Sequence, residues 1–265
     1  MSYTQSIVLG LVQGLTEFLP VSSSGHLILV PLIFGWPDQG LAFDAVMHLG
    51  TLGALLAYFR SELTGLVAGT LSRRLAAMIV VATIPGGLAG LLFGKWIEAN
   101  VRSALVIAAT TAVWGIVMWI ADRRAPAPPR TAEPLERVTW GQGLAVGCAQ
   151  ALALIPGTSR SGITITTGLL SGLDRATAAR YAFLLSIPIT AAAGGLKMLQ
   201  LLRAGLPTGE GGPLLVAVLV AFASGWFAVW FLVAYVRTRS LAPFVAYRLI
   251  LAAVILGAAA AGHLR

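Results

Sequence analysis

Long apolar runs, separated by short polar stretches, dominate the chain. A helix that crosses the hydrocarbon core of a bilayer needs about 20 mostly apolar residues. Six runs meet this requirement and predict spanning helices, at about residues 41–60, 75–94, 101–121, 178–202, 213–236 and 243–263. The pattern therefore predicts an all-α polytopic membrane protein, in which residues 1–265 form a single membrane domain.

Two further apolar regions, at about 5–35 and 139–172, are interrupted by polar residues. The first contains "TEFLPVSSSGH" and the second contains "LIPGTSRSGITIT". Each half of these regions has roughly 14 residues, which as a helix would be about 21 Å long. A core of about 30 Å is too thick for a helix of that length. We interpret each region as a re-entrant helical hairpin, which enters the membrane, turns near the midplane and returns to the same side.

The two hairpins resemble each other. Aligned without gaps, "QGLTEFLPVSSSGHLI" precedes "QALALIPGTSRSGITI" by 137 residues, and Phe43 precedes Tyr181 by 138 in the spans that follow. We predict two repeats, 1–122 and 139–265, each with one hairpin and three spans. Residues 123–138 form the linker between them. Because three spans separate the hairpins, the second repeat is inverted relative to the first, and such repeats place a binding site near the midplane.

Charge orients the predicted bundle. The chain is 57% hydrophobic and 11% charged, with mean hydropathy +0.86 and net charge +8. Eleven arginines lie in the loops on one side, near residues 60–74, 122–138, 173–180 and 236–242. The loops on the other side contain four Lys or Arg. Basic residues between apolar spans orient a membrane protein, so we expect no nucleic-acid partner. The arginine-rich side, including the linker, is predicted to be cytoplasmic, with the first hairpin and both termini outside.

Glu17 is the only acidic residue in either hairpin. Ionisable groups inside a membrane are costly and are usually functional. Its functional interpretation is a general base or a metal ligand, and the alternative is a neutral side chain hydrogen-bonded within the bundle. Gln13 lies four residues earlier, on the same helical face, and is predicted to contact the substrate.

Ser22, Ser23 and Ser24 precede the second half of the first hairpin. Serine is a favoured helix N-cap, which explains one of the three but not all of them. His26 follows Ser23 by three residues and can share a helical face with it. We predict that Ser23 and His26 are catalytic and that Ser22 and Ser24 bind substrate.

Arg160 occupies the repeat position of Ser23. A charged residue within a membrane segment costs at least about 2.5–3.5 kcal/mol on insertion scales, so an anion should neutralise it. The anion is either Glu17, in a structural pair, or a substrate phosphate held by the planar guanidinium. Helix N-termini at the midplane would also bind an anion. The neighbouring hydroxyls are predicted to bind substrate; they belong to Ser159, Ser161 and Thr164.

The repeats differ where chemistry is expected. Leu154 and Ile163 stand at the repeat positions of Glu17 and His26. One hairpin offers an acid, an imidazole and hydroxyls, and the other offers positive charge and hydroxyls. This division suits hydrolysis of a phosphate ester or anhydride. Asp44 and His48 share a face near the outer end of a span, and we leave them outside the predicted site.

The two motifs "QGLTEFLPVSSSGH" and "PGTSRSGIT" resemble those of the undecaprenyl-diphosphate phosphatases, the integral-membrane bacitracin-resistance proteins. The resemblance covers nearly the whole chain. Ser23, His26 and Arg160 match the serine, histidine and arginine that are essential in that family. Gln13 and Glu17 match its Glu/Gln-x-x-x-Glu pattern, in which many members have Glu at the first position. That departure leaves Glu17 as the sole acid of the site.

The resemblance implies a bacterial plasma-membrane enzyme with a site open to the periplasmic face. It would hydrolyse undecaprenyl or another polyprenyl diphosphate to the monophosphate and inorganic phosphate, and so recycle the lipid carrier of cell-wall synthesis. A divalent cation, Mg²⁺ or Ca²⁺, would assist, with Glu17 as a candidate ligand. The expected partners are the lipid substrate and membrane lipids, with a homo-oligomer left open.

In the mechanism that these residues favour, Ser23 attacks the terminal phosphorus and His26 or Glu17 acts as base. Arg160, the helix N-termini and the metal hold the anionic oxygens. A metal-activated water and His26 itself are alternative nucleophiles. Inverted repeats with an anion site are also typical of transporters, so the alternative function is a flippase for polyprenyl phosphate.

Overall fold

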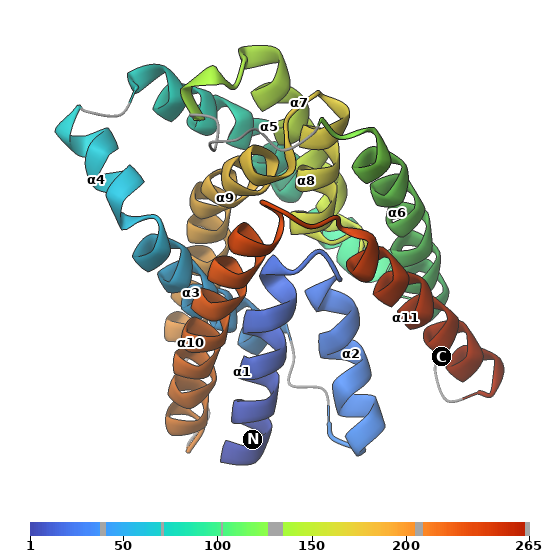
Figure 1. Cartoon of the computed structure of the whole chain (residues 1–265). Helices are drawn as coiled ribbons and strands as arrows, with labels where there is room; N and C mark the ends of the chain where they lie inside the picture. Colours follow the sequence, from blue (N-terminus) through green and yellow to red (C-terminus); the bar gives the residue numbers. More distant parts are fainter. Residues whose placement is uncertain (38–40, 70–71, 102, 127–134, 205–208, 263–265) are drawn as a thin grey trace.

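A computed structural model of the chain describes residues 1–37, 41–69, 72–101, 103–126, 135–204 and 209–262. These residues form helices joined by turns, and no strand occurs among them (Figure 1). The prediction of an all-α fold is confirmed for this part of the chain. The predicted linker 123–138 lies partly outside the described residues, since positions 127–134 are not among them.

The helices follow one another in the order that the apolar runs predict. The first half contains α1 (Tyr3–Phe18), α2 (Ser23–Phe34), α3 (Leu41–Tyr58), α4 (Arg60–Ala68), α5 (Arg73–Asn100) and α6 (Ala104–Arg124). The second half contains η1 (Leu135–Arg137), α7 (Trp140–Gln150), η2 (Ala151–Leu154), α8 (Arg160–Leu170), α9 (Arg175–Ala204), α10 (Gly211–Tyr235) and α11 (Ala242–Ala260). The short helices η1 and η2 are 3-10 helices.

Five of these helices, α5, α6, α9, α10 and α11, are long and apolar enough to cross a membrane. They correspond to five of the six predicted spans. The remaining one, 41–60, corresponds to α3, where the described apolar helix is the shorter Val46–Tyr58. Large apolar side chains lie on the outer surface, with Leu91 77% and Ile33 73% exposed. A surface of this kind suits lipid, and the chain is a multi-pass membrane protein.

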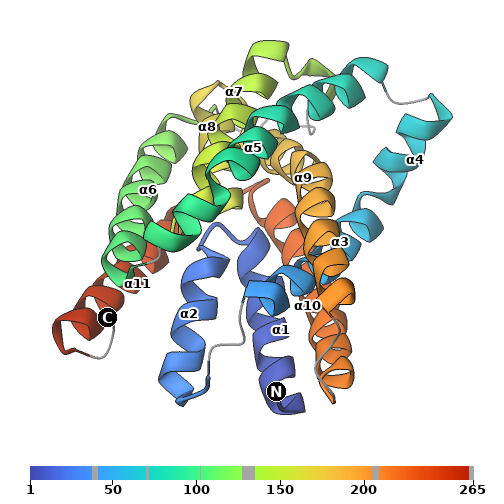
Figure 2. The ribbon, with the colours of Figure 1, turned by 180° about the vertical axis from the view of Figure 1, so that it is seen from behind.

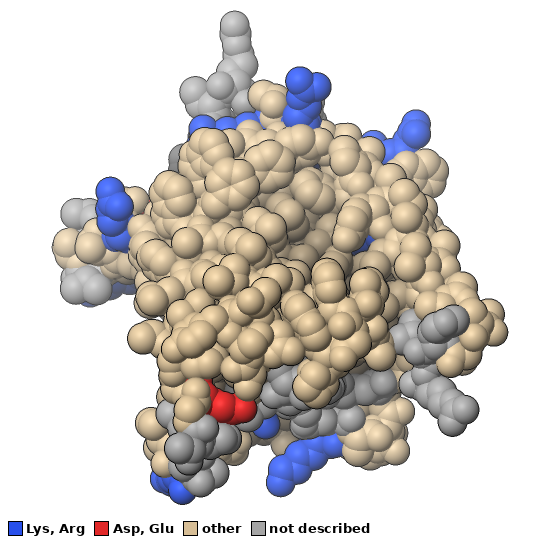
Figure 3. All heavy atoms as spheres, turned by 90° about the horizontal axis from the view of Figure 1, so that it is seen from below, with Lys and Arg blue, Asp and Glu red and all other residues tan. Residues whose placement is uncertain are grey.

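Charged side chains are sparse on one end of the molecule. Figure 3 views the end that carries the N-terminus of α1 in Figure 1, and uncharged residues cover most of it. The Lys and Arg atoms visible there lie mainly near its rim. Three of the loop arginines counted in the sequence, Arg73, Arg74 and Arg175, stand at the starts of α5 and α9, and both helices begin toward the opposite end. The two ends therefore differ in charge, as they do in an oriented membrane protein.

Two helical hairpins, α1–α2 and α7–α8, lie in opposite halves of the molecule. Figures 1 and 2 show α1–α2 in the lower half, with its connecting turn near the middle, and α7–α8 in the upper half. Both hairpins begin with a capping box, in which the side chains and backbones of two residues cap each other. Ser2 pairs with Gln5 in α1, and Thr139 pairs with Gln142 in α7. These pairs are again 137 residues apart, so the repeat extends to the helix caps.

Each hairpin packs against a long helix of the other half, α1 against α10 and α7 against α5. Two glycines at equivalent repeat positions allow this close approach. A Cβ at Gly10 would lie 2.6 Å from the backbone oxygen of Ala217, and one at Gly147 would lie 2.2 Å from that of Ala82. Small residues at such contacts let the backbones of membrane helices come close together. The packing thus carries both hairpins toward the centre of the molecule.

Candidate active site

The two hairpin turns share an unusual backbone conformation. Ser22 and Ser159, which immediately precede α2 and α8, have φ values of 74° and 69°. Among the described residues these are the non-glycine residues with positive φ, and they lie 137 positions apart. Such a conformation costs on the order of 1–3 kcal/mol and persists only where the surroundings enforce it. The turns therefore start both helices abruptly, with their N-termini directed into the centre.

Reciprocal hydrogen bonds join the two turns. The Ser24 hydroxyl accepts a hydrogen bond from the Gly157 N–H at 3.3 Å. The Ser161 hydroxyl donates to the Leu19 carbonyl at 3.2 Å. Each hairpin thus contributes one serine to the turn of the other. These contacts account for Ser24 and Ser161 as residues that assemble the site, beside the substrate-binding role that we predicted for them.

Arg248, from α11, contacts both turns and is fully buried. Its guanidinium donates to the carbonyls of Pro20 at 3.4 Å, Gly157 at 3.0 Å and Thr158 at 3.1 Å. A fourth bond, at 3.1 Å, reaches the Thr111 carbonyl in α6. Buried backbone carbonyls need hydrogen-bond donors, and one side chain here supplies them to both turns. Arg248 therefore fixes how far apart the two turns lie.

Glu17 is a buried carboxylate that contacts groups from four helices, α1, α2, α3 and α8. Its Oε2 atom accepts hydrogen bonds from Ser23 Oγ at 2.8 Å and from Gln13 Nε2 at 3.1 Å. His48 Nε2, from α3, lies 3.4 Å from the same oxygen. The other oxygen, Oε1, forms an ion pair with the Arg160 guanidinium of the second hairpin. The structure thus brings Gln13, Glu17, Ser23 and Arg160 together, as the sequence predicts.

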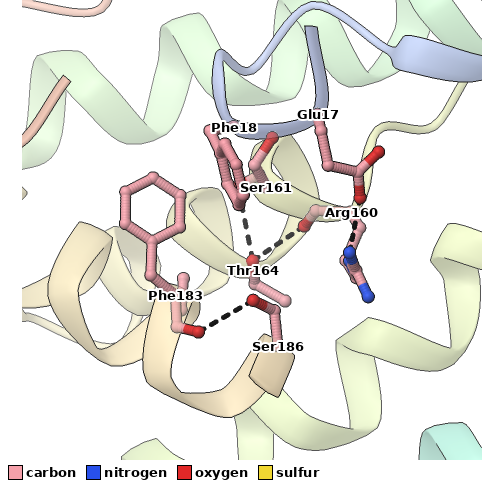
Figure 4. Close-up of a pocket in the computed structure, with 8 residues that line it drawn as sticks. Glu17, Phe18, Arg160, Ser161, Thr164, Phe183 and Ser186 are labelled. Carbon is pink, nitrogen blue, oxygen red and sulfur yellow. Dashed lines mark hydrogen bonds and ion pairs between the residues drawn. The ribbon is translucent and has the colours of Figure 1, made fainter. Parts of the chain in front are cut away.

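Arg160 begins α8 and faces a pocket that Figure 4 shows in close-up. Its second terminal nitrogen donates to Thr190 Oγ1 at 2.5 Å. The pocket is open on one side, with about 200 Å³ of space including that opening, and is lined by Glu17, Phe18, Arg160, Ser161, Thr164, Ala182, Phe183 and Ser186. Phe18 packs edge-to-face against Phe183, with ring centroids 5.5 Å apart. This contact anchors the end of α1, and with it Glu17, against α9.

The His26 side chain points away from Ser23 and Glu17, although its spacing in the motif suggests that it shares a face with Ser23. Its Nδ1 atom lies 2.7 Å from the Ser22 carbonyl, and its Nε2 atom lies 2.6 Å from the Tyr247 hydroxyl. The two rings are stacked, with centroids 5.6 Å apart and an angle of 8° between their planes. In the described part of the chain, His26 thus hydrogen-bonds to Ser22 and Tyr247, and not to Glu17 or Ser23. Packing against α11, which helical spacing cannot reveal, orients the ring.

The remaining predicted substrate-binding hydroxyls make local contacts. Ser159 Oγ accepts a hydrogen bond from the Gly162 N–H at 3.1 Å, as a helix N-cap does. Thr164 Oγ1 donates to the Arg160 carbonyl at 2.7 Å, one turn earlier in α8. Ser22 Oγ makes no capping bond and lies 3.2 Å from Ser24 Oγ. Of these three residues, Thr164 lines the pocket.

Comparison with known proteins extends the resemblance beyond the two motifs. The profile of the family described as "Bacitracin resistance protein BacA" matches residues 6–254. The chain belongs to this bacitracin resistance family. The match includes every residue described at the site, so the geometry described here is that of a member of the family.

Individual relatives are similar along almost their whole length. "Undecaprenyl-diphosphatase 2" of Stutzerimonas stutzeri is 48% identical over 269 residues, covering 97% of this chain and 98% of the relative. "Undecaprenyl-diphosphatase" of Moorella thermoacetica is 47% identical, with 96% and 97% covered. The protein of the same name from Saccharophagus degradans is 46% identical, with the same coverage.

Sequence reasoning missed four residues that the structure brings to the site. Arg248 interrupts an apolar span, and that intramembrane charge was a signal available in the sequence. His48 lies outside the predicted site, because nothing local in the sequence connects it with Glu17. Thr190 and Tyr247 lie in apolar spans and carry no comparable signal. The side chain of Asp44, which shares a helical face with His48 in the sequence, is not among those that the structure describes.

Proposed function

We propose that this chain hydrolyses undecaprenyl diphosphate to undecaprenyl phosphate and inorganic phosphate, which recycles the lipid carrier of cell-wall synthesis. The observation that carries the proposal is the meeting of Ser23 and Glu17 from one hairpin with Arg160 from the other. Relatives that bear the name of this activity are 46–48% identical over almost the whole chain. A buried acid, a hydroxyl and a guanidinium in contact are the groups that phosphoryl transfer to a side chain requires.

In the proposed reaction Ser23 Oγ attacks the terminal phosphorus. Its hydroxyl already donates to Glu17 at 2.8 Å, so this carboxylate takes the proton as the new P–O bond forms. The bond from phosphorus to the bridging oxygen breaks, and undecaprenyl phosphate leaves. Water then hydrolyses the phosphoserine and releases inorganic phosphate. The geometry favours Ser23 over His26 as the nucleophile, because both ring nitrogens of His26 lie within hydrogen-bonding distance of other groups.

Arg160 has two roles in this scheme. Without substrate it neutralises Glu17, so a buried carboxylate does not remain without a counterion. With substrate, its planar guanidinium holds the oxygens of the terminal phosphate. The N-termini of α2 and α8 add backbone N–H groups and the positive ends of their dipoles. Both interpretations of Arg160, as the partner of Glu17 and as a phosphate clamp, thus belong to successive states of one site.

A divalent cation, Mg²⁺ or Ca²⁺, belongs to the proposal, and one observation fits it. Gln13 Oε1 is buried and has no hydrogen-bond partner among the described residues, while Nε2 of the same side chain donates to Glu17. Carbonyl, hydroxyl and carboxylate oxygens suit hard cations, so Gln13, Ser23 and Glu17 would hold the ion. It would offset the negative charge of the diphosphate. The described residues contain no group of three or more His, Cys, Asp and Glu that could form a complete cage.

We further propose that both hairpins are re-entrant and that the two repeats are inverted, which gives six spans. Helix α1 has 16 residues and α8 has 11, so at 1.5 Å per residue they are about 24 Å and about 17 Å long. Neither length crosses a core of about 30 Å. The opposed hairpins of Figure 1, the matching capping boxes and the matching positive-φ serines support two inverted copies of one unit.

The excess of loop arginine supports the orientation. With the arginine-rich end in the cytoplasm, the end seen in Figure 3 faces the periplasm. The first hairpin then enters from outside, both termini lie outside, and the site opens to the periplasmic face. That face is where a diphosphate released by wall synthesis would arrive.

Phosphate release by the purified protein in detergent tests the proposed function. With undecaprenyl diphosphate as substrate, we expect wild type to release inorganic phosphate and Glu17→Gln to release almost none. Detergent micelles have no second compartment, so transport alone cannot produce this signal. Failure of wild type to release phosphate would reject the hydrolase proposal and favour the alternative, a flippase for polyprenyl phosphate.

A further inference from the structure

Helix α11 contributes a contact to the site that the proposed reaction does not use. The Tyr247 hydroxyl lies 2.6 Å from His26 Nε2, and the two rings are stacked. We propose that Tyr247 is a positioning residue, which holds the imidazole of His26 in a single orientation and tautomer for the hydrolysis. This inference rests on the proposed function, and it takes His26 as the essential histidine that the family resemblance implies.

The partners of the ring define the tautomer. A backbone carbonyl can only accept, so the contact at 2.7 Å from Ser22 requires a proton on Nδ1. In the neutral ring Nε2 is then an acceptor, and the Tyr247 O–H donates to it. The lone pair of His26 Nε2 is thus held toward α11 by the Tyr247 hydroxyl. A second partner that fixes the proton position on a catalytic imidazole is a recurrent arrangement.

The two anchors of the ring are themselves well fixed. Ser22 has a positive φ, at the turn that begins α2. Tyr247 directly precedes Arg248, whose guanidinium donates hydrogen bonds to the carbonyls of both hairpin turns. A shift of α11 would therefore move the phenol and the turns together. The distance between His26 and Ser23, which belong to one helix, is preserved by the same contacts.

Packing alone does not explain a tyrosine at this position. The Tyr247 side chain is 44% exposed, on a helix whose neighbouring exposed residues Leu249 and Ile250 are purely apolar. Tyrosines are enriched where a membrane meets water and the hydroxyl faces the head groups. Here the hydroxyl faces His26 instead. Phenylalanine would fill the same space and keep the ring stacking. The hydroxyl of Tyr247 is therefore the part of the side chain that packing does not explain.

Tyr247→Phe isolates that hydroxyl, because it keeps the ring and its stacking. We expect kcat for phosphate release to fall roughly tenfold, as for the loss of one ordered hydrogen bond, while KM and the melting temperature stay close to wild type. In a His26→Ala background the same change should have little further effect, because residues that act as a unit are not additive. Tyr235→Phe is the matched control: its hydroxyl makes no described hydrogen bond, and activity should be unchanged.

A spectroscopic measurement separates this inference from the proposed function. The chain contains three histidines, so ¹⁵N labelling of histidine gives few ring signals, and His26→Ala assigns those of His26. We expect the Nδ1–H tautomer in wild type and a changed Nε2 signal in Tyr247→Phe, whether or not the protein releases phosphate. An unchanged Nε2 signal would overturn the proposed bond. Unchanged kcat in Tyr247→Phe, or an equal loss in the His26→Ala background, would overturn the positioning role.

Discussion

At the scale of single residues, Glu17 is the negative charge around which the other polar groups of the site are arranged. Removing one partner from a buried ion pair leaves an uncompensated charge, which is strongly unfavourable. Here the carboxylate pairs with Arg160 and accepts from Ser23 and Gln13, with His48 at 3.4 Å. Arg160, which neutralises Glu17 before the reaction, is also the residue that we propose binds the terminal phosphate. Substrate binding should therefore rearrange charges that are already in place.

Arg160→Lys tests whether the planar guanidinium matters, since lysine keeps the charge but offers a single point of contact. Arg160 bonds to Glu17 and Thr190 through two different nitrogens, and a lysine cannot reproduce that fork. We expect the rate of phosphate release to fall by at least about tenfold, which corresponds to about 1.4 kcal/mol of transition-state stabilisation. Turnover near the wild-type level in the lysine variant would show that a point charge suffices.

Gln13→Glu tests the cation site. The change places a second carboxylate where Gln13 Oε1 is buried without a hydrogen-bond partner. We expect the variant to remain active and to reach half-maximal activity at a lower concentration of Mg²⁺ or Ca²⁺, because an added carboxylate strengthens binding of a hard cation. The measurement is a metal titration after chelation. An unchanged titration would place Gln13 outside the cation's ligands, with the role of holding Glu17 in position.

At the scale of helices, the two hairpins are predictable from the sequence and their crossing is not. Pro20 cannot continue a helix, and the serines that follow it favour a new start, so the break between α1 and α2 follows from local signals. The contacts of Arg248 and Tyr247 join residues more than 85 positions apart in the chain. Tertiary packing creates such pairs, so they cannot be predicted from the spacing of residues along a helix. The orientation of His26 away from Glu17 was unpredictable for the same reason.

Arg248 should stabilise the crossing of the hairpins. Arg248→Met removes a donor from the carbonyls of Pro20, Gly157 and Thr158. Each buried acceptor left without a partner costs about 1–3 kcal/mol, so we expect a clear loss of thermal stability in detergent together with a loss of activity. Arg248→Lys, which keeps the charge but cannot reach all three carbonyls, should lie between wild type and Met.

Arg239→Met is the control for this experiment, because Arg239 is exposed between α10 and α11. Its melting temperature should match that of wild type. If Arg248→Met were as stable as Arg239→Met, the guanidinium would not hold the turns together, and their geometry would have to depend on the serine contacts alone.

At the scale of the whole molecule, the proposed inverted architecture predicts which loops lie on each side of the membrane. Cys148 is the single cysteine and is exposed, so Cys148→Ser provides the background for single-cysteine labelling. We expect positions near 65 and 130 to react from the cytoplasm, and positions near 38 and 207 from outside. Reaction near 38 from the cytoplasm would contradict a re-entrant first hairpin, because the chain would then have crossed the membrane before α3.

The central claim is that a crossing of two hairpins assembles a phosphatase in which Ser23 attacks. The most direct test is phosphate release from undecaprenyl diphosphate by purified Ser23→Ala, with substrate binding measured on the same sample. We predict that turnover falls by at least about a thousandfold, as for the loss of a nucleophile, while binding persists through Arg160 and the N-termini of α2 and α8. Substantial hydrolysis by Ser23→Ala would contradict the account and assign the attack to water or to His26.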